Sequence, residues 1–372
     1  MTEAGGQSEW DVDRKSGVRH RPPAVIGPVA MIAHGIFPPD KMQPARVRAL
    51  LAEAALQGVD LCFLRSDECD PETGMVRAQR WDEGGWQESH LPLPPIVLII
   101  TDPETADDVR IDQWIRASAL ALGAGKRDKQ AVTDLLAGTE WKRYAVPSER
   151  LEPGRFDRQL ASWLDGGGIV VKPNDGMRGM GVHFVIPAGG GRWEVIKDGQ
   201  HRVVGADEAI DQLTRSIAGR LSYRSYLVQR YIDTSDRSGR PGTVRVELVR
   251  QPGGAWGVVR VTGRISAPGK IISTISRGAS LMTGEGYLAA RGETDIPGRL
   301  QELEAFSVGV ANLLTACDAA HYYEWGLDLM MDPERRFWFL EANTRPLNFG
   351  GEFERATHVI AYLKSLCRSL ER

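Results

Sequence analysis

The stretch "KPNDGMRGMGV", residues 172–182, places a lysine, an arginine and three glycines directly after the apolar run "GGGIVV". Glycines let a backbone approach a ligand closely, and successive free N–H groups in a turn form a concavity that binds anions. Lys172 would direct a compact positive charge at the same place. Two interpretations of this stretch alone remain open: a loop that binds phosphate, and an exposed β-hairpin turn with a surface lysine.

A second stretch with chemical potential is "GLDLMMDPERRFWFLEANTRP", residues 326–346. Its two apolar runs flank a proline-containing turn, which predicts a β-hairpin. If Asp332 and Arg335 close the turn, Asp328 lies opposite Phe339.

Side chains of a strand alternate between its faces, so this register places Asp328, Glu341 and Asn343 on one face, with the two carboxylates as a diagonal pair. Oxygen ligands of this kind suit Mg²⁺, and two carboxylates across such a gap could share one or two ions. The alternative is a solvated acidic face. The apolar neighbours "LMM" and "FWFL" favour a covered strand pair, in which unpaired carboxylates would be costly. A one-residue slip would undo this prediction.

Other phosphate and catalytic motifs do not fit the chain. Neither "GAGK" (123–126) nor "PGK" (268–270) completes a Walker loop. The glycines after Lys172 read GxxGxG and run into the strand-like "VHFVI", whereas a dinucleotide fingerprint opens a helix. Neither GxSxG nor HExxH occurs, so no covalent nucleophile is indicated.

The elements that must position these residues fall into three groups. Strands "AVIGPVAMIA", "GVDLCFL" and "LPLPPIVLII" alternate with helices near 43–57 and 107–122, which predicts a βαβ-type first domain. Short strands around the Gly-rich loop predict a middle lobe, and longer strands with helices near 299–316 and from 354 predict a last lobe. We expect a mobile polar segment at 1–22, an α/β domain at 23–125, a central lobe at 126–230 and a C-terminal lobe at 231–372.

Composition excludes several classes of protein. With 46 basic and 49 acidic side chains among 372 residues, no surface for nucleic acid or an anionic membrane is indicated. The four cysteines form no CxxC pair, which favours a reducing cytoplasm. No stretch approaches the roughly 20 apolar residues of a membrane span, and the polar start has no apolar export segment.

The motifs together resemble the ATP-grasp superfamily. The resemblance rests on "DKQAVTDLL" with "VPSE", the lysine before the Gly-rich hairpin loop, "LVQRYI", "TVRVELV" and "LEANTRP", and it covers about residues 126–348. Within that superfamily, "GRISAPGKIISTISRGA" and "GLDLMMD" look most like the YheC/YheD-type, endospore coat-associated branch. The fold class it implies is α+β, two lobes that sandwich a nucleotide, after an α/β N-terminal domain.

The resemblance implies roles for individual residues. Lys129 and Lys172 would contact the phosphates of ATP, and Arg245 the γ-phosphate. The remaining nucleotide contacts would come from the loop and from the hinge that reads adenine: Gly176, Met177, Arg178, Gly179, Gln229, Arg230, Tyr231 and Ile232. Asp328, Glu341 and Asn343 would bind Mg²⁺, or Mn²⁺ in its place. Thr243 stands where the family usually has Asp.

The activity implied is phosphorylation of a carboxylate by ATP, followed by attack of an amine on the acyl phosphate. Phosphoryl transfer depends mainly on positioning and charge neutralisation, which lysines, arginines and Mg²⁺ supply. Arg264, Arg277 and Arg345 are candidates for holding the substrate carboxylate, because guanidinium binds carboxylate through two parallel hydrogen bonds. Arg345, two residues past Asn343, is the preferred candidate, and surface arginines at strand ends are the alternative for each.

The predicted partners are a small carboxylic acid or amino acid and an amine, with a homodimer left open. Loops at 70–90 and 265–295 would shape the acceptor pocket, and the aromatics of "RWDEGGWQ" either line that pocket or pack a hairpin. Two rival functions remain: an ATP-grasp kinase and a non-catalytic structural or coat-type protein.

Overall fold

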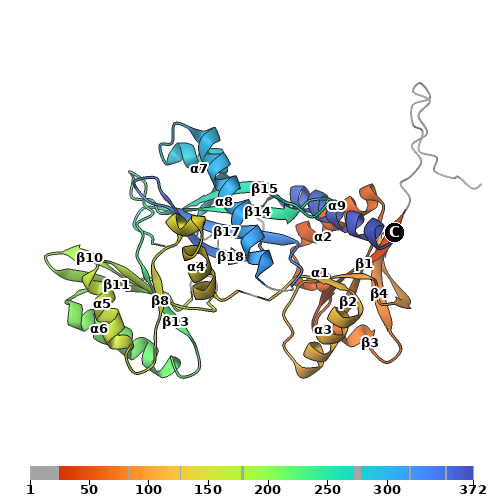
Figure 1. Ribbon diagram of the computed structural model, residues 1–372, viewed down its shortest axis with the longest axis horizontal. Helices are drawn as coiled ribbons and strands as arrows, with labels where there is room; N and C mark the ends of the chain where they lie inside the picture. Colours follow the sequence, from red (N-terminus) through yellow and green to blue (C-terminus); the bar gives the residue numbers. More distant parts are fainter. Residues whose placement is uncertain are drawn as a thin grey trace, which may run out of the picture.

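The computed structural model describes residues 25–82, 84–125, 127–176, 180–271, 278–317, 320–347 and 350–371. The predicted mobile segment at 1–22 lies outside these ranges. The described chain forms three β-sheets, which follow one another along the long axis of the molecule, with the sheet of residues 148–230 at one end and the N-terminal sheet at the other (Figure 1). The three sheets are formed within residues 26–122, 148–230 and 242–343, and the fold is α+β as expected.

The N-terminal sheet is parallel at its centre. Its strands are β1 (Ile26–Ala33), β2 (Val59–Arg65), β3 (Cys69–Asp70), β4 (Met75–Asp82), β5 (Gly85–Pro92), β6 (Ile96–Ile99) and β7 (Leu120–Leu122). The order β3-β4-β2-β1-β6-β7 puts β1 between parallel partners β2 and β6, and β5 pairs with β4. Because both faces of β1 are covered, its buried run of apolar residues does not alternate.

Helices cover both faces of this sheet. They are α1 (Pro38–Lys41), α2 (Pro44–Gln57) and α3 (Ala106–Ser118). The helix predicted at 107–122 therefore ends four residues early, because 120–122 pair with β6 as a parallel edge strand. Trp81 and Trp86 face each other across the β4–β5 hairpin, and Trp86 packs on Phe37 and Phe63. These tryptophans pack a hairpin.

The middle sheet is antiparallel and has its own core. Its strands are β8 (Ser148–Arg150), β9 (Ile169–Pro173), β10 (His183–Gly189), β11 (Arg192–Lys197), β12 (Gln200–Val204) and β13 (Tyr226–Arg230), in the order β12-β11-β10-β9-β13-β8. Ile169, Val171 and Val185 point to α5 (Phe156–Asp165) and α6 (Ala206–Ile217). Side chains at alternate positions, including Lys172 of β9, therefore face away from these helices.

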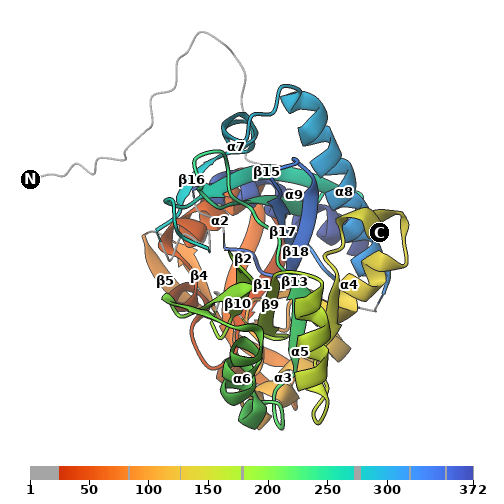
Figure 2. The same ribbon diagram turned by 90° about the vertical axis from the view of Figure 1, so that its left-hand side faces the viewer.

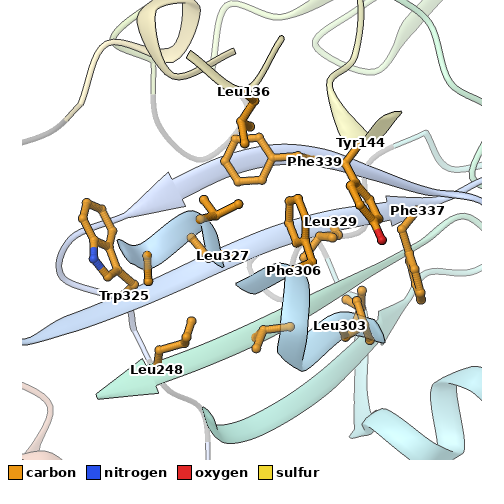
Figure 3. Close-up of a cluster of buried hydrophobic side chains, with 14 of the residues drawn as sticks. Leu136, Tyr144, Leu248, Leu303, Phe306, Trp325, Leu327, Leu329, Phe337 and Phe339 are labelled. Atoms are coloured by element: carbon orange, nitrogen blue, oxygen red, sulfur yellow. The ribbon is translucent and has the colours of Figure 1, made fainter. Parts of the chain in front are cut away.

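The third sheet holds the largest core. Its strands are β14 (Gly242–Arg250), β15 (Trp256–Ile265), β16 (Ser280–Thr283), β17 (Glu324–Met331) and β18 (Phe337–Asn343), in the order β16-β15-β14-β17-β18. Its apolar face packs on α8 (Ile296–Ala316), where Phe306 meets Leu327, Leu329 and Phe339 (Figure 3). A short helix α7 (Gly284–Ala290) lies beside α8 (Figure 2), within the range expected as a loop.

Two helices pack on a sheet other than the one formed by the strands next to them in the sequence. Val132 and Leu136 of α4 (Lys129–Ala137) belong to the core of the third sheet, although β8 and the middle sheet follow α4. Val359 and Leu363 of α9 (Glu352–Leu370) belong to the core of the N-terminal sheet and pack beside α2. The N-terminal domain and the C-terminal lobe thus share a helix, and α4 is held on the third sheet.

Candidate active site

The hairpin of β17 and β18 closes one residue later than predicted. Asp332 donates its backbone N–H to Arg336 O at 3.0 Å and accepts the N–H of Arg335 at 2.9 Å. Arg335 adopts φ 65°, the left-handed conformation typical of a three-residue hairpin loop. The predicted closing pair, Asp332 with Arg335, is therefore wrong by one position.

A β-bulge at Leu340 restores the predicted face. Leu329 pairs with Phe339, whereas the next residue of β17, Asp328, pairs with Glu341, so Leu340 is the extra residue. Phe339 consequently lies in the core opposite Leu329, and not opposite Asp328 as predicted. The two carboxylates are direct cross-strand neighbours instead of a diagonal pair.

Asp328, Glu341 and Asn343 come together at this point. The Asn343 amide nitrogen lies 3.2 Å from Asp328 Oδ2 and 3.4 Å from Glu341 Oε1. Two carboxylates and one amide oxygen fit a hard cation such as Mg²⁺. As a ligand, Asn343 would present its oxygen, which a rotation of the side-chain amide supplies. Within the described ranges, no cluster of three His, Cys, Asp or Glu side chains could hold a metal ion, so the amide is needed to complete the set.

The carboxylate of Asp328 is neutralised by two arginines. Arg245, its cross-strand neighbour on β14, donates Nε to Asp328 Oδ1 at 2.8 Å and Nη2 to Oδ2. Arg264 of β15 brings Nη1 to 3.4 Å from Asp328 Oδ1. Burial alone would raise the pKa of Asp328, but these guanidinium groups outweigh it and lower the pKa below its ordinary value. The carboxylate is therefore ionised.

Lys129 links the third sheet to the Gly-rich loop. This first residue of α4 places Nζ 3.2 Å from Glu341 Oε2 and donates to Gly176 O at 2.8 Å. Sequence reasoning missed Asn174, whose side chain forms hydrogen bonds with the same end of α4. It accepts from Gln130 N at 3.2 Å and donates to Asp128 at 2.5 Å. The start of the loop is thus fixed to α4.

Lys172 is buried on the face of the middle sheet that points away from α5 and α6, with 8% of its surface exposed. Burial and, to a smaller extent, the charge of Lys129 lower the pKa of Lys172 to about 8, and the charge of Glu341 opposes both. These influences show that Lys172 shares one electrostatic site with groups of the third sheet. Both predicted phosphate-binding lysines therefore lie near the predicted metal ligands.

The Gly-rich stretch connects two antiparallel strands, as predicted, because β9 pairs with β10. A Cβ on Gly176 would lie 3.2 Å from Pro173 O, so a side chain there would crowd the turn. Met177, Arg178 and Gly179 lie outside the described residues.

The predicted adenine hinge begins where β13 ends. Gln229 is buried between Ser148 and Val170 on the neighbouring strands. The Arg230 side chain turns away to cap Trp163, with its guanidinium carbon 5.2 Å from the ring centroid.

Beyond the strand, Tyr231 donates its backbone N–H to Gly168 O at 2.8 Å and packs edge-on against Phe184. Ile232 follows in a segment without regular secondary structure. The apolar wall from Phe184 and Tyr231 next to the chain that leaves β13 is suited to a flat aromatic base.

Arg345 has an ionic partner that sequence reasoning missed. It forms an ion pair with Asp102, which follows β6 in the N-terminal domain. The next residues of this loop are also held: Pro346 O accepts from Arg46 at 2.7 Å, and Leu347 O lies 3.4 Å from Arg245 Nη1. Arg277 lies outside the described residues.

A middle sheet that carries the buried Lys172 and the start of the Gly-rich stretch, and a third sheet that carries the carboxylates and arginines, define an ATP-grasp fold. Solved structures with this fold are similar to the chain. D-alanyl-alanine synthetase A from Vibrio cholerae O1 biovar eltor has a TM-score of 0.56 at 14% identity, over 94% of this chain and 99% of that one. D-cycloserine synthetase DcsG has a TM-score of 0.52 at 15% identity, over 92% and 100%.

The sequence comparisons are more specific. The model of the YheC/D-like ATP-grasp family matches residues 122–369. The chain belongs to this family, which confirms the resemblance drawn from the motifs. It is 22% identical to the endospore coat-associated protein YheD of Bacillus subtilis strain 168, over 86% of this chain and 73% of that protein. It is 21% identical to YheC of the same organism, over 85% and 89%. The superfamily uses ATP with Mg²⁺.

Proposed function

We propose that the protein is an ATP-dependent ligase that activates a carboxylate as an acyl phosphate and joins it to an amine. The observation that carries the proposal is the meeting of Lys129, Lys172 and Arg245 with the Asp328, Glu341 and Asn343 cluster. Cations for phosphate and ligands for a divalent metal come together there, and phosphoryl transfer depends on positioning and charge neutralisation by such groups.

Each group has a role in this mechanism. Lys172 and Lys129 hold the phosphates beneath the Gly-rich loop, and Arg245 holds the γ-phosphate and stabilises the charge that develops on transfer. Asp328, Glu341 and Asn343 would hold Mg²⁺, which would supply charge neutralisation at the phosphate oxygens. The substrate carboxylate attacks the γ-phosphorus, ADP leaves, and the amine then displaces phosphate from the acyl carbon.

Arg264 is the proposed contact for the acid substrate, because it lies beside Arg245 at the metal ligands. Arg345 is the weaker candidate of the two, since Asp102 already accepts its charge. Solved structures with a similar fold include a D-alanyl-alanine synthetase and the ATP-grasp ligase PsnB complexed with a minimal precursor. The class of acid and amine is accordingly the part of the proposal that experiment must supply.

The test is phosphate release from Mg²⁺-ATP in the presence of amino acids, small carboxylic acids and short peptides, singly and in pairs, with mass spectrometry of the products. A ligase releases phosphate when both substrates are present and forms a product of summed mass less water. A phosphorylated product without a second substrate would identify a kinase instead.

A non-catalytic role is the second candidate, because the curated relatives are named for their association with the endospore coat. Calorimetry with Mg²⁺ and a non-hydrolysable ATP analogue separates the two. Absence of nucleotide binding would favour the structural role and contradict the ligase.

A further inference from the structure

The acidic metal ligands are engaged by the chain's own phosphate-binding cations. Asp328 is held by Arg245 and by Arg264 Nη1, and Glu341 is held by Lys129 at 3.2 Å. Asp328 is 4% exposed and Arg245 is 7% exposed, so their ion pair is almost free of solvent. Each partner is therefore the counter-charge that keeps the other stable in the interior.

A divalent cation arriving alone meets an unfavourable site. To bind Asp328 it must displace the guanidinium groups, which would then be buried without a counter-ion and would repel the metal. Removing one partner of a buried pair is strongly destabilising, because the other charge stays behind. The internal ion pairs thus oppose metal binding to the free protein.

A nucleotide changes this balance because its phosphates can replace the carboxylates as partners of Arg245 and Lys129. The carboxylates are then released toward the metal, and the cations toward the phosphates. The exchange is reciprocal: bound metal also removes the carboxylates that would repel the phosphates.

Arg264 has a distinct place in this exchange. Its Nε is buried and has no hydrogen-bond partner among the described residues, and its Nη1 lies 3.4 Å from the Asp328 oxygen that Arg245 Nε also contacts. The second guanidinium adds positive charge at the metal ligand without being the main partner of that carboxylate. Its removal should weaken the opposition to metal while leaving the Arg245 pair in place.

We infer that Arg264 makes divalent-metal binding at Asp328 and Glu341 depend on the nucleotide, so that neither binds well without the other. This inference rests on the proposed nucleotide site. It means that Arg264 opposes metal binding in the free protein. Once phosphates have replaced the carboxylates as partners of the cations, Arg264 is available to the acid substrate.

The experiment compares the full chain with Arg264→Gln and with Arg260→Gln as the matched control. Arg260 lies on the same strand, and its Nε lies 3.9 Å from Glu354 Oε2. Mn²⁺ binding without nucleotide is measured from the free-ion electron paramagnetic resonance signal. Binding of a non-hydrolysable ATP analogue is measured by calorimetry in EDTA and in excess Mg²⁺, and thermal unfolding checks that each variant folds.

We expect Arg264→Gln to bind Mn²⁺ at least about fivefold more tightly than the wild type, since couplings of this kind are typically 5- to 150-fold. Arg260→Gln should match the wild type. Equal Mn²⁺ affinity in both variants and the wild type, or tight wild-type Mn²⁺ binding without nucleotide, would overturn the inference while nucleotide binding persists. No analogue binding under any condition would instead overturn the proposed function.

Discussion

Asp328 and Glu341 face each other directly across β17 and β18 because the bulge at Leu340 shifts the register by one residue. Without that bulge, Glu341 would pair with Leu327 and point into the core beside α8. The composition of the predicted metal site therefore depends on one extra residue in one strand.

The first prediction concerns this pair. Glu341→Gln removes one carboxylate ligand and should abolish Mg²⁺-ATP turnover. Because Glu341 is partly exposed and its pair with Lys129 is worth about 1 kcal/mol or less, the midpoint of thermal unfolding should stay within a few degrees of the wild type. Phosphate release and calorimetry on the same preparation check both statements. Undiminished turnover would refute the metal assignment.

Lys172→Met should stabilise the free protein and weaken nucleotide binding. Burial lowers the pKa of Lys172 to about 8, so at pH 7 the residue is protonated both folded and unfolded, and the cost of burying its charge is fully present. That cost is on the order of 3 kcal/mol as an upper limit and disappears as pH rises from about 8 past 10.5.

Denaturant unfolding at pH 7 measures the gain in stability, and titration of an ATP analogue measures the loss of nucleotide binding. The exposed Lys142 supplies the control Lys142→Met, which should alter neither quantity. Loss of stability in Lys172→Met would show that the buried charge has a stabilising partner.

Glu247 should make the protein less stable as the solution becomes more alkaline. Burial raises the pKa of Glu247 from 4.5 to about 7, although Arg245 and Arg260 oppose the shift. Between these values the folded state binds more protons than the unfolded state, so this group lowers the unfolding free energy as pH rises through the window. Glu247→Gln should therefore gain stability relative to the wild type, more at pH 8 than at pH 5. A gain that is the same at both pH values would contradict the shift.

Gly326→Ala should disturb the loop that follows Asn343. A Cβ at Gly326 would lie 2.6 Å from Pro346 Cβ and 3.6 Å from Arg245 Nε. Overpacking of this kind typically costs about 1–3 kcal/mol, and here it would also displace the loop residues that Arg46 and Arg245 hold. Gly219→Ala, where a Cβ meets nothing within 4 Å, is the control. The free energy of unfolding from chemical denaturation and the affinity from nucleotide titration should differ between the two variants. Identical values would contradict the prediction.

Several predictions made from the sequence hold because they depend on local patterns. The helix expected at 43–57 is α2, and the lysine before the Gly-rich stretch ends a strand that pairs with the strand after it. Apolar periodicity and turn residues act over a few positions, so they can be read along the chain. The helix end at Ser118 was missed because pairing of 120–122 with β6 overrides local propensity.

The sequence by itself determined the family and the fold class, since these follow from residue types in a fixed order, and it predicted Asp328, Glu341 and Asn343 as neighbours. The tertiary structure alone decided which of those groups neutralise one another. Arg245 and Arg264 are 83 and 64 residues from Asp328, and Asp102 is 243 residues from Arg345. Charges so far apart along the chain become partners only when the strands and domains that carry them pack together, because electrostatic interactions depend on distance in space and on burial.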